Sequence, residues 1–106
     1  MNKETILKKI RWMMLNKDNL LKKIQKSPKI FEDMSEEIRS NKEIALATVK
    51  QNGLMLRFAS ENLQNDKELI LEAIKQNWYA IYYLNEESQG DREVILEAIK
   101  QNSNAL

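Results

Sequence analysis

The sequence predicts an all-α protein, a short right-handed stack of helical-hairpin repeats that is solenoid-like and has a period of about 25 residues. The chain of 106 residues contains only two glycines and one proline, too few for the many turns of an all-β fold. Its commonest residues are good helix formers. Similar stretches recur at this period, and each is too short to be a stable helix alone, so neighbouring units must stack and share a core.

The repeat is clearest in the second half of the chain. Residues 66–81 read DKELILEAIKQNWYAI and residues 91–106 read DREVILEAIKQNSNAL, with identity at eleven of sixteen positions. NKEIALATVKQN at 41–52 and, more weakly, NKDNLLKKIQ at 16–25 continue the register. We therefore expect a single helical-repeat domain over 1–106, divided into an N-terminal helix at 1–15, repeats at 16–40, 41–65 and 66–90, and a partial repeat at 91–106.

Each unit is expected to contain two short helices. Asn41, Asp66 and Asp91 are natural N-caps, because their side-chain oxygens accept unpaired N–H groups of a first helical turn. Gly53 follows the end of a helix and is expected to be a left-handed cap. The predicted helices are 3–14, 17–26, 42–51, 67–76 and 92–102, with shorter ones at 29–34, 54–59 and 79–84.

Apolar residues at equivalent inward positions should form the core. These residues are Ile24, Leu46, Val49, Leu71, Ile74, Leu96 and Ile99. The repeat alignment also predicts that Tyr79 and Tyr83 are in the core, and that Trp78 and Tyr82 lie nearer the surface.

The last unit keeps the apolar pattern of an internal one. Val94 and Ala98 can pack back onto the third unit, whereas part of Ile95, Leu96 or Leu106 should stay exposed. The tail then either folds back over these side chains, pairs end to end with a second chain, or receives a partner. Of these we expect weak homodimerisation through 91–106, with two-fold symmetry.

The DKELILEAIKQN and DREVILEAIKQN stretches, each leading into a second amphipathic segment, resemble domain-of-unknown-function family 4116, a repeat family of bacterial and viral proteins. The resemblance is close over 41–106, weaker over 16–40 and absent over 1–15. It implies an α-helical repeat array without an assigned activity, and no catalytic residues carry over. Three residues depart from the family pattern. Trp78 stands where a small residue is usual, and Lys22 and Lys23 stand at positions that are packed in other units.

Composition narrows the chemistry that we expect. The chain has no cysteine and no histidine, so disulfides, thiolate zinc sites and a Ser-His-Asp triad are excluded. Its carboxylates and serines fit solvated helix faces, caps and turns, and no glycine-rich phosphate loop is present. We expect no enzymatic activity, cofactor or metal. No apolar run approaches the ~20 residues of a membrane span, and no signal-peptide pattern is present, so we expect a cytoplasmic protein without membrane contact.

Charge is unevenly distributed along the chain. Residues 1–29 contain nine basic and two acidic residues, a net charge of +7, and the remainder has a net charge of −6. This split either serves solubility or creates a basic end that meets phosphates or an acidic protein. Trp12 near Lys8 and Lys9 either stacks on bases or anchors a protein contact, or else packs on a neighbouring helix. The first candidate binding site is therefore the basic N-terminal cluster Lys8, Lys9, Trp12, Lys22 and Lys23.

Trp78 and Tyr82 form the second candidate site. They are four residues apart and can lie side by side on a helix, where exposed aromatic pairs anchor interfaces, or else they only close a gap beside the loop. We expect a non-enzymatic interaction module that binds a protein. The alternative is a small phage- or mobile-element-encoded inhibitor or binder that acts on nucleic acid, or on a nucleic-acid-processing enzyme, through its basic N-terminal end.

Overall fold

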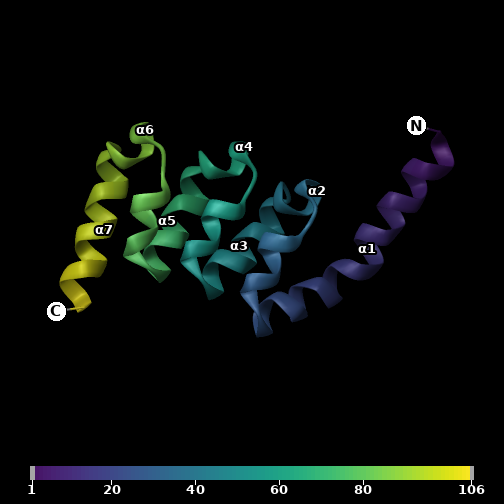
Figure 1. The fold of residues 1–106 in the computed structure, drawn as a ribbon, viewed down its shortest axis with the longest axis horizontal. Coiled ribbons are helices and arrows are strands. Elements are labelled where there is room, and N and C mark those ends of the chain that lie inside the picture. The colour runs from purple at the N-terminus through teal and green to yellow at the C-terminus, as the bar shows by residue number, and fades with distance from the viewer. Residues whose placement is uncertain (1, 106) are drawn as a thin grey trace.

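The computed structural model describes the backbone of residues 2–105 and the side chains of residues 2–7 and 16–103. Throughout this part the chain is helical without any strand, so the all-α prediction is confirmed (Figure 1). The molecule measures 53 × 28 × 18 Å, and the two ends of the chain lie at opposite ends of its long axis (Figure 1). This elongation is expected of repeats that each contact only their neighbours.

Three kinds of element alternate along the chain. The main helices are α1 (Lys3–Lys26), α3 (Lys42–Gln51), α5 (Lys67–Gln76) and α7 (Arg92–Ala105). Six-residue 3₁₀ helices follow the first three: η1 (Pro28–Asp33), η2 (Gly53–Phe58) and η3 (Trp78–Tyr83). Four-residue α-helices complete each unit: α2 (Glu36–Arg39), α4 (Glu61–Gln64) and α6 (Glu86–Gln89). Each of the three full units thus contains three helical elements, and the prediction of two was wrong because it missed the four-residue helices.

Side-chain caps explain where the repeated helices begin and end. As predicted, Asn41, Asp66 and Asp91 accept backbone N–H groups in the first turns of α3, α5 and α7, at 3.1, 3.2 and 2.9 Å. Asn52 and Asn77 each join two elements. Their backbone N–H groups donate to the preceding helix at 2.9 Å, and their side chains accept the N–H two residues on at 3.0 Å. Because each Asn both ends an α-helix and begins a 3₁₀ helix, the second element follows the first directly.

Helix α1 is unbroken, whereas the sequence predicted separate helices at 3–14 and 17–26. Asn16 occupies the position of the cap Asn41, but it lies inside the helix. No proline or glycine interrupts residues 3–26, and the helix ends just before Pro28, which begins η1. The first half of α1 extends away from the other helices at one end of the molecule (Figure 1).

Equivalent elements pack side by side along the stack. α1 contacts α3, α3 contacts α5, and α5 contacts α7 (Figure 1), and likewise η1 contacts η2 and η2 contacts η3. One continuous apolar core runs through these contacts, and the equivalent residues Ile24, Val49 and Ile74 are fully buried in it. The right-handed sense of the stack remains a prediction.

The predicted core was wrong at the last unit. Leu96 and Ile99 are 55% and 56% exposed. Among the described residues no 3₁₀ helix follows α7, so nothing covers these side chains as η3 covers α5. Leu46 and Leu71, also predicted to be buried, are only half-buried at the rim of the core.

The other side of α7 agrees with its prediction. Val94 and Ala98 are buried where α7 meets the third unit. Ile95 and Leu96 are exposed, and Leu106 lies outside the described residues.

Gly53 is not a left-handed cap, because neither glycine of the chain has a positive φ. A Cβ atom on Gly53 would lie 2.2 Å from the carbonyl oxygen of Ala73. The glycine therefore allows η2 to approach the backbone of α5 in the next unit.

Candidate protein-binding surface

Three aromatic rings of η3 form a contiguous surface, which we call the aromatic patch: Trp78, Tyr79 and Tyr82. The rings of Trp78 and Tyr79 are stacked, with centroids 4.3 Å apart. Tyr82 lies 6.2 Å from Trp78 and 5.6 Å from Tyr79, at tilted angles. These separations fall within the range of favourable aromatic pairs, so the rings support one another's orientation.

The 3₁₀ geometry of η3 places these side chains together. Three residues complete a turn, so Tyr79 and Tyr82 project from the same side of the helix. Ala80 and Leu84 point into the core and hold the element in place. Trp78 is half-buried against the core, whereas Tyr79 and Tyr82 are 55% and 63% exposed. The patch thus has a fixed base and two accessible rings.

The prediction that Tyr79 and Tyr83 are core residues was wrong, since both are exposed. Their counterparts Leu54 and Phe58 are half-buried in η2 and carry no polar atom. A tyrosine at either position keeps its hydroxyl in water by turning outward. Trp78 and Tyr82 lie nearer the surface, as predicted, although Trp78 is more covered than its partner.

Outside the aromatic patch, Arg57 of the preceding unit contacts two further aromatic rings. Its guanidinium carbon lies 5.1 Å from the centroid of the Tyr83 ring and 4.6 Å from that of Phe58. Both distances are within reach of a cation–π contact. Sequence reasoning placed Tyr79 in the core and did not include Arg57 among the candidate site residues. The repeat alignment does give one signal for Arg57, since Arg57 and Tyr82 occupy equivalent positions.

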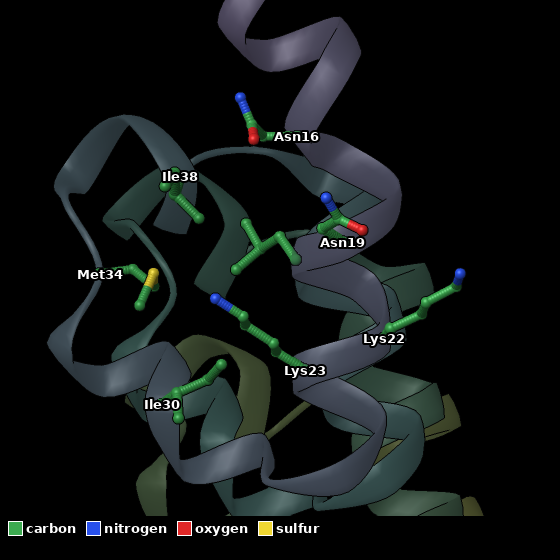
Figure 2. Close-up of a pocket in the computed structure, with 8 residues that line it drawn as sticks. Asn16, Asn19, Lys22, Lys23, Ile30, Met34 and Ile38 are labelled. Carbon is green, nitrogen blue, oxygen red and sulfur yellow. The ribbon is translucent and has the colours of Figure 1, made fainter.

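The basic N-terminal cluster is only partly visible. The side chains of Lys8, Lys9 and Trp12 lie outside the described residues. Lys22 and Lys23 are both exposed on α1, but they point in different directions. Figure 2 shows Lys23 reaching toward η1, while the amine of Lys22 points away. The structure therefore does not bring these two lysines together as one site.

Lys23 reaches across a groove of about 490 Å³ between α1 and the η1–α2 segment (Figure 2). We call it the N-terminal groove. Its apolar lining residues are Leu20, Ile30, Met34 and Ile38, and its polar rim residues are Asn16, Asn19, Lys22 and Lys23. An apolar floor with a polar and basic rim suits an amphipathic helix better than a small polar ligand.

Ion pairs link successive units in a ladder that sequence reasoning missed. Lys42 lies 3.0 Å from Asp66 and 3.0 Å from Glu68. One unit further, Lys67 lies 3.2 Å from Asp91 and 3.4 Å from Glu93. In each case the lysine begins one main helix, and the acids lie in the cap and first turn of the next. One unit earlier, Lys17, which lies inside α1, pairs with Glu43 in the first turn of α3.

The ion pairs of the ladder shift the pKa values of the residues that form them. Hydrogen bonds to Asp66 and Glu68 raise the pKa of Lys42. Burial acts to raise the pKa of Asp66, but Lys42 and the capped backbone N–H groups outweigh it and hold that pKa below its usual value. The hydrogen bond from Lys67 likewise lowers the pKa of Asp91. All these groups are solvated, so the shifts indicate structural pairing rather than a catalytic centre.

Among the side chains that the structure describes, those of residues 2–7 and 16–103, no group of three or more acidic, histidine or cysteine residues is placed to hold a metal ion. No helix in that same range has both the length and the apolar composition needed to cross a membrane.

Comparison with known proteins finds one family. The family model described as "Domain of unknown function (DUF4116)" matches residues 16–64, 41–89 and 66–106. The three overlapping matches begin at positions 16, 41 and 66, which are the unit boundaries predicted from the sequence. No curated protein and no solved structure shows significant similarity to the chain.

Proposed function

We propose that this chain, which belongs to the DUF4116 family of domains of unknown function, is a non-enzymatic module that binds a partner protein through the aromatic patch. The single observation that carries the proposal is the exposure of Tyr79 and Tyr82 beside Trp78. Rigid aromatic side chains offer much contact area at a low cost in conformational entropy, and for this reason they dominate protein interfaces. The proposal includes a cytoplasmic location.

Two features of the patch support a binding role over a purely structural one. The equivalent positions of the second unit, Gly53, Leu54 and Arg57, stack into the same repeat without any aromatic residue. The architecture therefore does not require rings at these positions. In addition, Tyr79 and Tyr82 leave more than half of their surfaces in water, so packing within the chain uses less than half of each side chain.

The proposal is tested by capture of proteins from the native host, with the intact chain as bait. We expect Tyr79→Ser/Tyr82→Ser to lose a partner that the unchanged protein retains, with an affinity at least about tenfold lower. Because both residues are exposed, the melting temperature should stay nearly constant. Lys50→Ser, an exposed change on α3 of the preceding unit, is the matched control. Equal binding by the double variant and the unchanged chain would contradict the proposal.

The second candidate function is binding to nucleic acid, or to an enzyme that processes it, through the basic end. It is favoured by the exposed Lys22, Lys23 and Lys26 on α1, where the only acid between 16 and 26 is Asp18. Contacts between lysines and phosphates weaken steeply with added salt, because binding releases counterions. Binding through the aromatic patch should depend much less on salt. A salt titration of the captured complex therefore separates the two functions.

A further inference from the structure

The two ends of the stack expose complementary surfaces. At one end, α7 presents an apolar ridge, which we call the α7 face: Arg92, Ile95, Leu96 and Ile99. Ile95 and Ile99 are 38% and 56% exposed. Their counterparts in α5, Ile70 and Ile74, are 2% and 0% exposed because neighbouring elements cover them. Among the described residues, nothing covers this side of α7.

At the other end, the N-terminal groove exposes the opposite side of the repeat interface. Its apolar lining residues have counterparts in the second unit that are all buried, namely Ala45, Met55, Ala59 and Leu63. The first unit lies against them, since α1 packs on α3 and η1 packs on η2. The groove is therefore the surface on which a preceding unit sits in every other part of the stack.

The ion-pair ladder ends with one unmatched charge at each end of the molecule. Arg92 occupies the position of Lys42 and Lys67, but it has no acidic partner among the described residues. Asp18 occupies the position of Glu43 and has no basic partner there. The cation lies on the α7 face and the anion lies on α1 beside the groove, so the two ends have opposite charges where the ladder would continue.

We propose that the α7 face of one copy packs into the N-terminal groove of a second copy, so that chains join head to tail. Within a chain, each cation of the ladder meets an acid of the following unit. Between chains, Arg92 meets Asp18 in the same register. Ile95 and Ile99 then cover Leu20 on the α1 side of the groove, as each main helix covers the next one within a chain.

Head-to-tail contact differs from the two-fold pairing expected from the sequence. Two α7 faces packed against each other would leave the groove empty and would pair neither Arg92 nor Asp18. A heterologous contact uses both ends and leaves one free end of each kind, so assembly continues into linear chains. This inference concerns the ends of the stack and does not depend on the aromatic patch.

Sedimentation velocity from low micromolar to millimolar concentration tests the assembly. We expect the average mass of the unchanged protein to grow through dimers and trimers without a limiting size. Ile99→Asp should remain monomeric, because the charge would be buried in the groove. A strict monomer throughout, or growth that stops at a dimer, would overturn the proposal. Circular dichroism shows whether the variant keeps its helices, as we expect for a residue that is already exposed.

A charge exchange tests the register of the contact. Arg92→Glu and Asp18→Lys should each weaken assembly several-fold, because each places like charges together. The double variant Arg92→Glu/Asp18→Lys should assemble again, and so should an equimolar mixture of the two single variants. Lys75→Glu, which makes the same change of charge on the middle unit, should assemble normally. Failure of both the double variant and the mixture to recover would show that Arg92 and Asp18 do not meet.

Discussion

Gly53 and Trp78 occupy the same position in consecutive units, yet their surroundings differ. Gly53 has an ordinary backbone conformation and lets η2 approach the Ala73 carbonyl of α5. Trp78 cannot allow such an approach, and it forms the half-buried base of the aromatic patch instead. The sequence shows that the two residues differ. It cannot show that the glycine serves a close backbone approach, because that approach depends on how two units pack.

The two glycines of the chain give a matched test of this reading. Gly53→Ala should destabilise the fold by about 1–3 kcal/mol, because its Cβ would lie 2.2 Å from a backbone oxygen that cannot move freely. Gly90→Ala places its Cβ no nearer than 3.5 Å to any neighbour, in a right-handed helical conformation. This control should be neutral or stabilise by up to about 1 kcal/mol. Urea denaturation measures both. Equal effects of the two substitutions would rule out the close approach as the role of Gly53.

At the scale of the element, predictions succeeded where caps and periodicity coincide. α3 and α5 span the predicted ranges 42–51 and 67–76, because a cap residue precedes each and an Asn ends each. The break predicted inside α1 was wrong. Asn16 matches the cap Asn41, but no turn accompanies it, so the helix continues through this position. The four-residue helices are too short to show the period of an α-helix, and a sequence pattern cannot distinguish a 3₁₀ turn from a short α-helix.

Substitutions at equivalent positions of α5 and α7 should change the free energy of unfolding by different amounts. Ile74→Ala should cost about 2–5 kcal/mol of unfolding free energy, because Ile74 is fully buried in α5. Ile99→Ala removes the same atoms from α7, where the side chain is mostly exposed, and should cost less than about 1 kcal/mol. The Leu71→Ala cost should lie between these values, since Leu71 is half-buried. The measurement is urea denaturation at a concentration low enough to keep the chain monomeric. Equal costs for the two isoleucines would contradict the observed burial.

At the scale of the whole molecule, the most regular feature is the ion-pair ladder, which sequence reasoning missed. Lys17, Lys42 and Lys67 recur at the same position of successive units, as do the acids that pair with them. Counting charge by segment gave a basic end and an acidic remainder, and it hid the pairing of each lysine with the following unit. The aromatic pair Trp78 and Tyr82 could be predicted from its departure from the repeat, whereas the ladder required knowing that equivalent helices lie side by side.

The ladder makes stability depend on pH in a defined direction. Lys67 lowers the pKa of Asp91, and for Asp66 the ion pair with Lys42 and the cap bonds outweigh the opposing effect of burial. A carboxylate whose pKa is lower in the folded state stabilises the fold fully above its unfolded value, here 3.8, and loses that contribution as the pH falls through the folded value. The pKa values of Lys42 and Lys67 are raised, so their contribution is fully present below the unfolded value of 10.5 and is lost as the pH rises through their higher folded-state pKa values.

Replacing the two aspartates by asparagine isolates this electrostatic part. Asp66→Asn/Asp91→Asn should keep the helix caps, since Asn41 caps α3 with the same geometry, but it removes both charges. We expect the urea midpoint of the variant to lie below that of the unchanged protein at neutral pH. The gap should close as the pH falls below 3.8, where the native aspartates also become neutral, and again as it rises above 10.5. Glu61→Gln/Glu86→Gln makes an equal change of charge outside the ladder and should show a smaller gap at neutral pH. A gap that persists unchanged into acid would mean that the variant had lost its caps, and that the pairing of charges along the stack does not contribute to the stability of the fold.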